Sequence, residues 1–319
     1  MSADLPRHAA DLPLVRTRVL GDLRLHAIEA GLQWLDGGAM FGVVPKPLWE
    51  RRIPADDRNR IPLATRCLLV ETPDELVLIE TGLGNKSDAK AIEIYGIDSL
   101  PTDPSTGPDR LQAGVCEAGY SPDEVTLVVN THLHFDHAGG NTFRGGDGEV
   151  RVAFPRARYV VQWQEWEYAH RTNERTRASY VREDFDPVHA ASAFHFLHGA
   201  LEVIPGVTTV LTPGHTPHHQ SVLVHSAGQT ACFLGDVAPT MAHLPLPWIM
   251  GYDVEPLVTL ESKRLILDRA LEEGWLLVST HDPVTPWGFL EQEGKKLVLR
   301  DARAPLAPQV SGGHSGEER

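Results

Sequence analysis

The most informative part of this chain is the stretch Thr126-Leu-Val-Val-Asn-Thr-His132-Leu-His134-Phe-Asp136-His137-Ala-Gly-Gly-Asn141. An apolar run typical of a buried strand leads straight into three histidines and an aspartate. His132 and His134 are two residues apart, so in an extended chain both side chains point to the same side. Asp136 and His137 follow at an expected turn into a helix. Imidazoles and a carboxylate aimed into one small volume suit a divalent metal ion, and the aspartate adds a ligand for a second metal or a proton acceptor.

Three further segments place a polar residue just beyond an apolar strand. His215 follows Val210-Leu-Thr-Pro-Gly, Asp236 follows Phe233-Leu-Gly, and His281 follows Val278-Ser-Thr. Side chains at strand ends are held by a rigid scaffold, and functional residues often lie there. We therefore expect these three residues to join the site that the first segment begins.

Working outward, the chain alternates short apolar strands with helices, which predicts sheets covered by helices, an α/β sandwich. The clearest helix is Leu257–Glu273, which ends at Gly274, and weaker helices are expected at Leu111–Ala118 and Gln162–His170. We expect one domain over residues 1–319, with flexible tails at about 1–12 and 303–319. The predicted strands are Val15–Leu20, Leu23–Glu29, Arg66–Glu71, Leu76–Glu80, Thr126–Asn130, Arg158–Gln162, Val207–Leu211, Ser221–His225, Thr230–Gly235 and Trp275–Thr280.

Composition excludes several classes of protein. The 319 residues include 29 Lys and Arg against 43 Asp and Glu, a net charge of −14 without a basic cluster, which argues against nucleic acid or an anionic membrane as partner. No stretch approaches the roughly 20 apolar residues of a membrane helix, and the N-terminal residues do not form a signal peptide. The three widely spaced cysteines indicate neither a disulfide scaffold nor a cysteine zinc site and fit a reducing cytoplasm. We therefore expect a cytoplasmic protein.

With these motifs in that order, the sequence resembles the metallo-β-lactamase-fold hydrolase superfamily. The resemblance implies a four-layer αββα sandwich. It also implies that His132, His134 and His215 hold one metal ion, that Asp136, His137 and His281 hold a second, and that Asp236 bridges the two. Glu80-Thr-Gly stands where the superfamily has Asp-Thr-Gly, so Glu80 carries one more methylene group than the usual residue that supports the ligand loop.

Two branches of the superfamily are set aside by single residues. His134 stands where the diiron redox branch has a carboxylate, which favours hydrolysis. Asp236 stands where true β-lactamases often have a cysteine, which favours a bridged dinuclear site over antibiotic hydrolysis. Two divalent ions are therefore expected, zinc first, with manganese, iron or cobalt also compatible with histidine and aspartate ligands.

A closer likeness lies in the segment Asp36-Gly-Gly-Ala-Met40-Phe41-Gly-Val-Val-Pro-Lys-Pro-Leu-Trp49, which is similar to the opening of the YtnP-like quorum-quenching N-acyl-homoserine lactonases. Asp236 to His243 and Tyr252-Asp253 also match their pattern. We interpret the first segment as a structured loop that lines the substrate site or contacts a second subunit, so a homodimer stays open. Met40, Phe41, Trp49 and His243 are the predicted substrate-binding residues.

The resemblance implies a hydrolase that opens a small-molecule lactone or ester by means of a hydroxide bridging the two metals, with Asp136 as the catalytic proton acceptor. A tyrosine that some related lactonases place shortly after the bridging aspartate is absent, because Val237, Ala238 and Pro239 follow. A phosphotriesterase or arylesterase on the same site is the alternative within the fold. A non-catalytic metal-binding protein is the alternative of another class.

Overall fold

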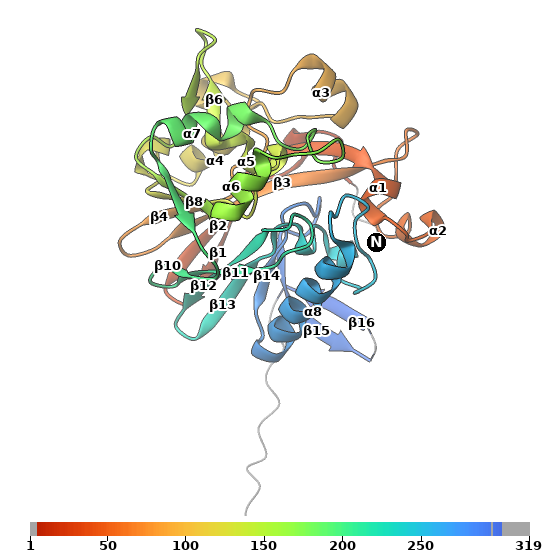
Figure 1. Cartoon of the computed structure of the whole chain (residues 1–319). Helices are drawn as coiled ribbons and strands as arrows, with labels where there is room; N and C mark the ends of the chain where they lie inside the picture. The colour runs from red at the N-terminus through yellow and green to blue at the C-terminus, as the bar shows by residue number, and fades with distance from the viewer. Residues whose placement is uncertain (1–4, 295, 302–319) are drawn as a thin grey trace, which may run out of the picture.

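Two seven-stranded sheets dominate the computed structural model, which describes residues 5–294 and 296–301 (Figure 1). The first sheet has the order β1-β2-β3-β4-β5-β8-β9 and the second the order β10 to β16, with β6 and β7 forming a separate hairpin. The strands of the first sheet are β1 (Val15–Leu20), β2 (Leu23–Asp36), β3 (Arg60–Glu71), β4 (Leu76–Ile79), β5 (Leu127–Val129), β8 (Arg158–Gln162) and β9 (Phe194–Leu197). Those of the second are β10 (Glu202–Ile204), β11 (Val207–Leu211), β12 (Gln220–Ser226), β13 (Gln229–Phe233), β14 (Leu276–Val278), β15 (Trp287–Glu293) and β16 (Lys296–Arg300), and the hairpin is β6 (Thr142–Arg144) with β7 (Val150–Val152).

The helices lie on the outer faces of the two sheets (Figure 1). On one side the structure places α4 (Arg110–Glu117), α5 (Phe135–Ala138), α6 (Trp163–Ala169) and α7 (Asp186–Ala190), and on the other side α8 (Pro256–Glu273). Helices α1 (Gly37–Phe41), α2 (Lys46–Trp49) and α3 (Ala89–Tyr95) lie toward one end, and the remaining helical turns are 3₁₀ helices. Among the described helices, none has the length together with the hydropathy needed to span a bilayer.

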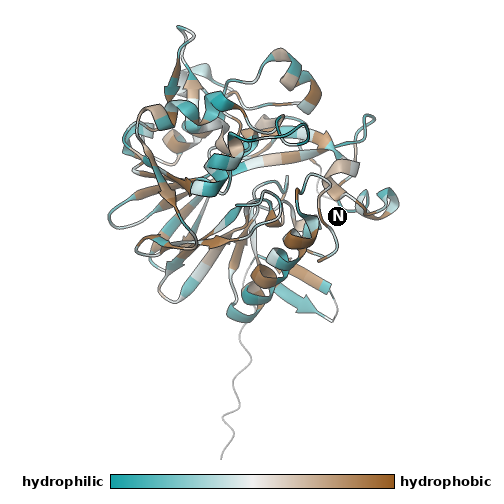
Figure 2. Cartoon of the chain, in the orientation of Figure 1, coloured by the Kyte–Doolittle hydropathy of each residue, from teal (hydrophilic) through white to brown (hydrophobic). Residues whose placement is uncertain are grey.

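Alternation along the strands explains the layers. In β3, Leu68 and Val70 point into a core that both sheets share, whereas Cys67 and Leu69 point outward into the core under α4. The outer face of the second sheet packs against Ile266 of α8 and its neighbours in the helix. Two-sided burial of this kind gives four layers, so the predicted αββα sandwich is confirmed. Figure 2 shows hydrophobic residues concentrated on the strands and hydrophilic residues on the outlying loops.

Most predicted strands and all three predicted helices are present within a few residues, but the structure extends or adds several elements. The strand predicted at Leu23–Glu29 continues to Asp36, past an irregularity in register between Glu29 and Leu32. The strand predicted at Arg66–Glu71 begins earlier, at Arg60. The segment predicted as a loop at residues 36–49 forms α1 and α2, because Asp36 caps α1 and Pro45 and Pro47 suit the first turn of α2.

The predicted tails differ in outcome. Residues 1–4 and 303–319 lie outside the described residues. Within 5–12, however, a 3₁₀ helix at Ala9–Asp11 packs against the body, with Ala9 and Leu12 buried and the Ala9 N–H donated to Asp98. Apolar side chains thus hold this part against the body.

Close backbone approach positions the metal-ligand turn against the loop after β4. The Thr81 N–H donates to the His137 carbonyl at 2.8 Å, and Gly140 N–H donates to the Gly82 carbonyl at 3.2 Å. A Cβ on Gly140 would lie 2.2 Å from the Thr81 oxygen, so only glycine fits there. The glycines that follow His137 thus allow the two loops to meet.

Candidate metal centre and cavity

All seven predicted metal ligands meet at one edge of the sandwich, each carried by a segment that follows a strand. His132 and His134 follow β5, and Asp136 and His137 lie on α5. His215 follows β11, Asp236 lies on the 3₁₀ helix Gly235–Val237 after β13, and His281 follows β14. Strands β4, β5 and β8 run parallel, as do β13 and β14, so their ends bring these side chains together. All seven residues are at least nine-tenths buried.

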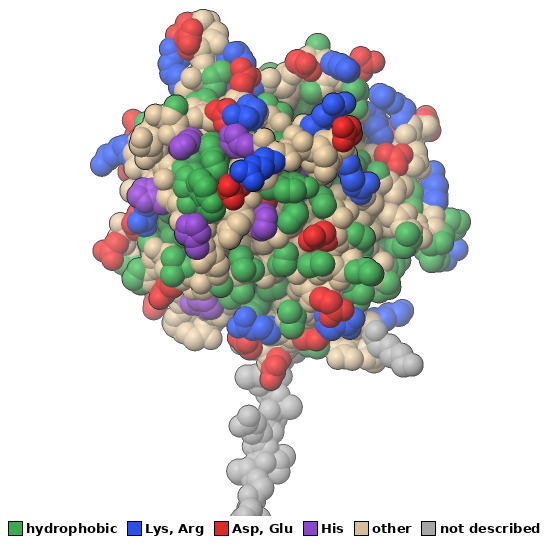
Figure 3. Space-filling view, viewed as in Figure 1, with side chains coloured by type: hydrophobic (Ala, Val, Ile, Leu, Met, Phe, Trp, Pro, Cys, Tyr) green, Lys and Arg blue, Asp and Glu red, His purple; other side chains and the backbone are tan. Residues whose placement is uncertain are grey.

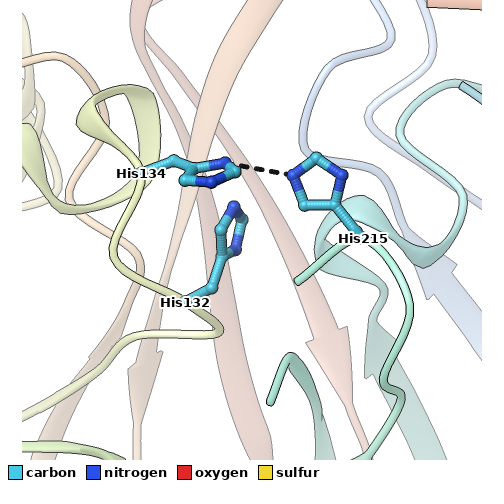
Figure 4. A group of neighbouring side chains, drawn as sticks. All are labelled: His132, His134 and His215. Atoms are coloured by element: carbon cyan, nitrogen blue, oxygen red, sulfur yellow. Dashed lines mark hydrogen bonds between the residues drawn. The ribbon is translucent and has the colours of Figure 1, made fainter. Parts of the chain in front are cut away.

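His132, His134 and His215 form one compact group. Their ligand nitrogens lie within 4.8 Å of one another, and the three rings converge from two different loops (Figure 4). His134 Nδ1 lies 3.1 Å from His215 Nε2. Asp136, His137 and His281 form a second group of the same kind, in which the Nε2 atoms of His137 and His281 are 3.1 Å apart.

Asp236 lies between the two groups. Its Oδ2 is 3.2 Å from His215 Nε2, and its Oδ1 is 3.1 Å from His281 Nε2 and 3.5 Å from His137 Nε2. One carboxylate therefore faces three imidazoles drawn from both groups. This is the position that a bridging ligand would occupy.

The donor atoms fit divalent metal ions. Within the described residues, His132 Nε2 and Asp236 Oδ1 are buried and have no hydrogen-bond partner, which is costly unless a ligand binds them. Burial and the neighbouring imidazoles hold the pKa values of His132 and His134 well below their usual range, so both rings are neutral. Burial would raise the pKa of Asp236, but the His137, His281 and His215 imidazoles hold it well below its usual range. Burial would lower the pKa values of His137 and His215, but Asp236 and the other carboxylates beside them hold both above the usual range. Two neutral imidazoles and a carboxylate anion among these donors suit a metal ion, which would displace the protons of the other imidazoles.

The far nitrogen of three of the histidines is held by a hydrogen-bond partner, and that of His137 faces Glu80. His132 Nδ1 lies 2.8 Å from the Thr131 hydroxyl, and His281 Nδ1 lies 2.6 Å from the Ala64 carbonyl oxygen. His215 Nδ1 lies 2.9 Å from Asp253 Oδ1, and His137 Nδ1 lies 3.2 Å from Glu80 Oε2. These contacts leave the Nε2 atoms to point into the site.

Glu80 reaches the ligand loop despite its extra methylene group. Its Oε1 accepts a 2.6 Å hydrogen bond from the Thr131 N–H, while Oε2 faces His137. The residue adopts a left-handed φ of 66°, an unusual conformation for glutamate that the surrounding bonds stabilise. The Glu-for-Asp departure therefore preserves the contact with the ligand loop.

The loop that carries His281 is anchored to the opposite sheet. Arg66 on β3 is buried, pairs with Glu29, and donates through Nη1 to the Ser279 carbonyl at 2.6 Å and through Nη2 to the Asp282 carbonyl at 2.9 Å. The Ala64 N–H donates to the His281 carbonyl at 3.1 Å. Strand β3, which begins earlier than the sequence predicts, thus positions His281, a predicted ligand that follows a strand of the other sheet.

Sequence reasoning misses Gln33 and gives Asp253 no role. Gln33 on β2 donates from Nε2 to Asp136 Oδ2 at 2.5 Å. His219, which the sequence suggests as a supporting or a surface residue, accepts the Asp236 N–H through Nε2 at 3.0 Å. Gln33 lies about a hundred residues from Asp136, so no local pattern connects them.

A cavity of about 360 Å³ opens directly on the candidate metal centre. One end is formed by His134, Asp136, His215, Asp236 and His281. The other walls are largely apolar and aromatic, with Arg175, Thr176 and Ser179 as the polar exceptions. The apolar and aromatic lining residues are Leu35, Ala39, Met40, Leu63, Tyr95, Phe135, Met250, Tyr252 and Val254.

Of the four predicted substrate-binding residues, only Met40 lines this cavity. Phe41, Trp49 and His243 are almost fully buried and do not line it. The Phe41 ring stacks on His243 at 4.4 Å and on Trp49 at 5.3 Å, and His243 Nε2 lies 2.8 Å from the Met40 carbonyl oxygen. They support the wall rather than form it, because α1 directs Met40 and Phe41 to different sides.

The comparison with known families agrees with this geometry. The model of the Metallo-beta-lactamase superfamily matches residues 60–281. The chain belongs to the metallo-beta-lactamase superfamily. Members of this superfamily bind divalent metal ions, and the two donor groups described above could hold them in this chain.

Similar proteins within the superfamily include lactonases and hydrolases. The chain is 30% identical over 170 residues to an N-acyl homoserine lactonase of Bacillus cereus, covering 53% of this chain and 61% of that protein. It is 32% identical over 172 residues to the N-acyl homoserine lactonase AttM of Agrobacterium fabrum (strain C58), covering 52% and 61%. A solved structure of a probable metal-dependent hydrolase from Staphylococcus aureus matches with a TM-score of 0.78 at 28% identity, covering 90% of this chain and 100% of that one. The chain thus spans about three fifths of the length of the curated relatives it matches.

Proposed function

We propose that this protein is a metal-dependent hydrolase that opens the lactone ring of N-acyl-homoserine lactones. The observation that carries the proposal is the cavity, because one space is lined both by metal-ligand donors and by apolar walls. A homoserine lactone has a small polar ring and a flexible apolar tail, so it matches both parts. The similarity to lactonases of Bacillus cereus and Agrobacterium fabrum supports the same substrate class.

We propose two metal ions in each chain, zinc in preference to manganese, iron or cobalt. Two groups of three donors, with Asp236 facing both, support this number. Bound divalent ions would polarise the lactone carbonyl and increase the acidity of water. The assignment of the seven residues as ligands of these two ions is part of the proposal.

The residues of the chain would act around that chemistry. Asp136 lines the cavity and is held by Gln33, so its carboxylate is placed to accept a proton from the attacking water. The water oxygen forms a bond to the carbonyl carbon, the ring C–O bond breaks, and the same proton passes to the leaving alkoxide oxygen. The product is the open N-acyl-homoserine. Met40, Met250 and Val254 would hold the acyl tail and exclude water from the far end of the cavity.

A hydrolysis panel tests the proposal. Zinc-loaded protein should hydrolyse short-chain and long-chain N-acyl-homoserine lactones faster than a simple γ-lactone, an aryl ester or a phosphotriester. A chelator should abolish this activity, and added zinc should restore it. Faster turnover of the phosphotriester or the aryl ester would overturn the proposed substrate class. No turnover of any compound by protein that carries its metals would instead indicate a non-catalytic metal-binding protein.

A further inference from the structure

Glu165 on α6 is a buried carboxylate outside the predicted ligand set. Its side chain is inaccessible to solvent, and within the described residues no lysine or arginine pairs with it. Its oxygens instead accept three hydrogen bonds. Oε1 accepts from the Leu133 N–H at 3.2 Å and from the Tyr180 hydroxyl at 2.9 Å, and Oε2 accepts from the Thr216 hydroxyl at 2.8 Å. Burying a carboxylate without a cation costs free energy, so all three donors are needed to hold it there.

The three donors lead to the three-histidine group. Leu133 lies between His132 and His134 in the chain, and Thr216 directly follows His215. The Tyr180 ring contacts the His134 imidazole edge to face, with ring centres 4.7 Å apart. One side chain from a third element therefore joins the two loops whose histidines converge in Figure 4.

The other group of ligands has contacts of its own. His281 is held by the Ala64 carbonyl and Asp136 by Gln33, and His137 faces Glu80, which also accepts the Thr131 N–H beside His132. None of the three hydrogen bonds accepted by Glu165 comes from these ligands or from these supports. Loss of the Glu165 carboxylate should accordingly loosen one half of the site and leave the other in place.

We propose that Glu165 is a positioning residue that arranges His132, His134 and His215 for their metal ion and has no such effect on the group of Asp136, His137 and His281. This inference rests on the metal binding that the proposed function includes. When the two loops are already arranged, the metal ion does not have to order them, and residues that orient metal ligands are typically worth about 10–100-fold in metal affinity.

The test measures the zinc affinity of metal-free protein by competition with a chromophoric chelator. It uses two background variants, each of which leaves one of the two ligand groups intact. His281→Ala impairs the second group, and His215→Ala impairs the three-histidine group. Adding Glu165→Gln, which keeps the size but replaces one acceptor oxygen by an N–H donor, should weaken zinc binding about 10–100-fold in the His281→Ala background. The same change in the His215→Ala background should leave the affinity unaltered.

Two controls keep the result interpretable. Glu167→Gln makes the same chemical change on α6, at a partly exposed carboxylate that pairs with Arg171, and should alter neither affinity. Tyr180→Phe removes one of the three hydrogen-bond donors and leaves the Glu165 carboxylate in place. It should therefore weaken zinc binding by the three-histidine group by a smaller factor than Glu165→Gln does. It also serves as the test if Glu165→Gln does not fold.

Each outcome bears on a separate claim. Equal losses in both backgrounds would show that Glu165 stabilises the protein generally, and no loss in either would show that it does not position the histidines. Both results overturn the inference while leaving the proposed function intact. A wild-type chain that binds no zinc would instead contradict the proposed metal site itself.

Discussion

At the scale of single residues, Asp136 connects the candidate metal centre to the cavity. Its Oδ2 lies 3.6 Å from His281 Nε2 and accepts a hydrogen bond from Gln33, and its carboxylate forms part of the cavity wall. Asp136→Asn keeps this shape but removes the negative charge and the proton acceptor. We expect kcat for an N-acyl-homoserine lactone to fall about 10²–10⁴-fold, the usual contribution of a general acid–base group.

Steady-state kinetics together with thermal melting and metal analysis check this prediction. In metal-free protein the melting temperature should stay close to that of the wild type, since no packing changes. Asp123→Asn, on an exposed 3₁₀ turn, is the matched control and should leave kcat unchanged. Near-wild-type kcat in an Asp136→Asn protein with its full metal content would remove Asp136 from the mechanism.

Asp109 is a second residue with a measurable consequence. It caps α4 by accepting the Gln112 N–H, but it is buried, and burial raises its pKa from 3.8 to about 6. Between pH 3.8 and about pH 6, the Asp109 carboxyl group is ionised in the unfolded chain but still protonated in the folded chain. The stabilisation from the neutral folded form is therefore complete below about pH 4 and is lost as the pH rises through about 6.

Asp109→Asn removes this loss because asparagine also caps helices but does not ionise. Relative to the wild type, the free energy of unfolding of the variant should rise by about 3 kcal/mol between pH 4 and pH 7. Urea unfolding at several pH values measures the difference. A constant difference between the two proteins across this range would show that Asp109 is not titrating as described.

At the scale of elements, α1 and α2 separate the cavity wall from its support. Met40→Ala should reduce the preference for long acyl chains, because each buried methylene is worth about 0.8 kcal/mol, or roughly fourfold in kcat/KM. Phe41→Ala should instead lower the free energy of unfolding by about 3–5 kcal/mol, since it leaves a void between Trp49 and His243. Kinetics over a series of chain lengths and chemical denaturation distinguish the two effects. The reverse pattern would place Phe41, not Met40, at the substrate.

At the scale of the whole molecule, the metal ions should stabilise the fold because their ligands come from both sheets. Elemental analysis should find two ions per chain. Removal by a chelator should lower the melting temperature, and an ion present at 100 times its dissociation constant adds about 2.7 kcal/mol to stability. One tightly bound ion, with no gain on adding more metal, would contradict the dinuclear site.

Charge at this scale is distributed without a large patch of one sign on the visible face. Figure 3 shows basic and acidic side chains interspersed there, although the chain carries a net charge of −14.

The sequence by itself determined the layer architecture and the ligand candidates. Short apolar strands bounded by turn residues and the stop at Gly274 are local signals, and so is the close spacing of His132, His134, Asp136 and His137. The order of His215, Asp236 and His281 after apolar strands was sufficient to predict that they would meet. The superfamily match confirms the family that these motifs indicated.

Only the tertiary structure decided which groups support those ligands and which side chains face the cavity. Gln33, Asp253 and Glu165 reach the site from elements far away in the chain, so no spacing rule connects them with the histidines. The separation of Met40 from Phe41, Trp49 and His243 depends on how α1 packs against its neighbours. Local patterns specify which residues are apolar or polar, whereas the direction of each side chain depends on the partners that folding brings to it.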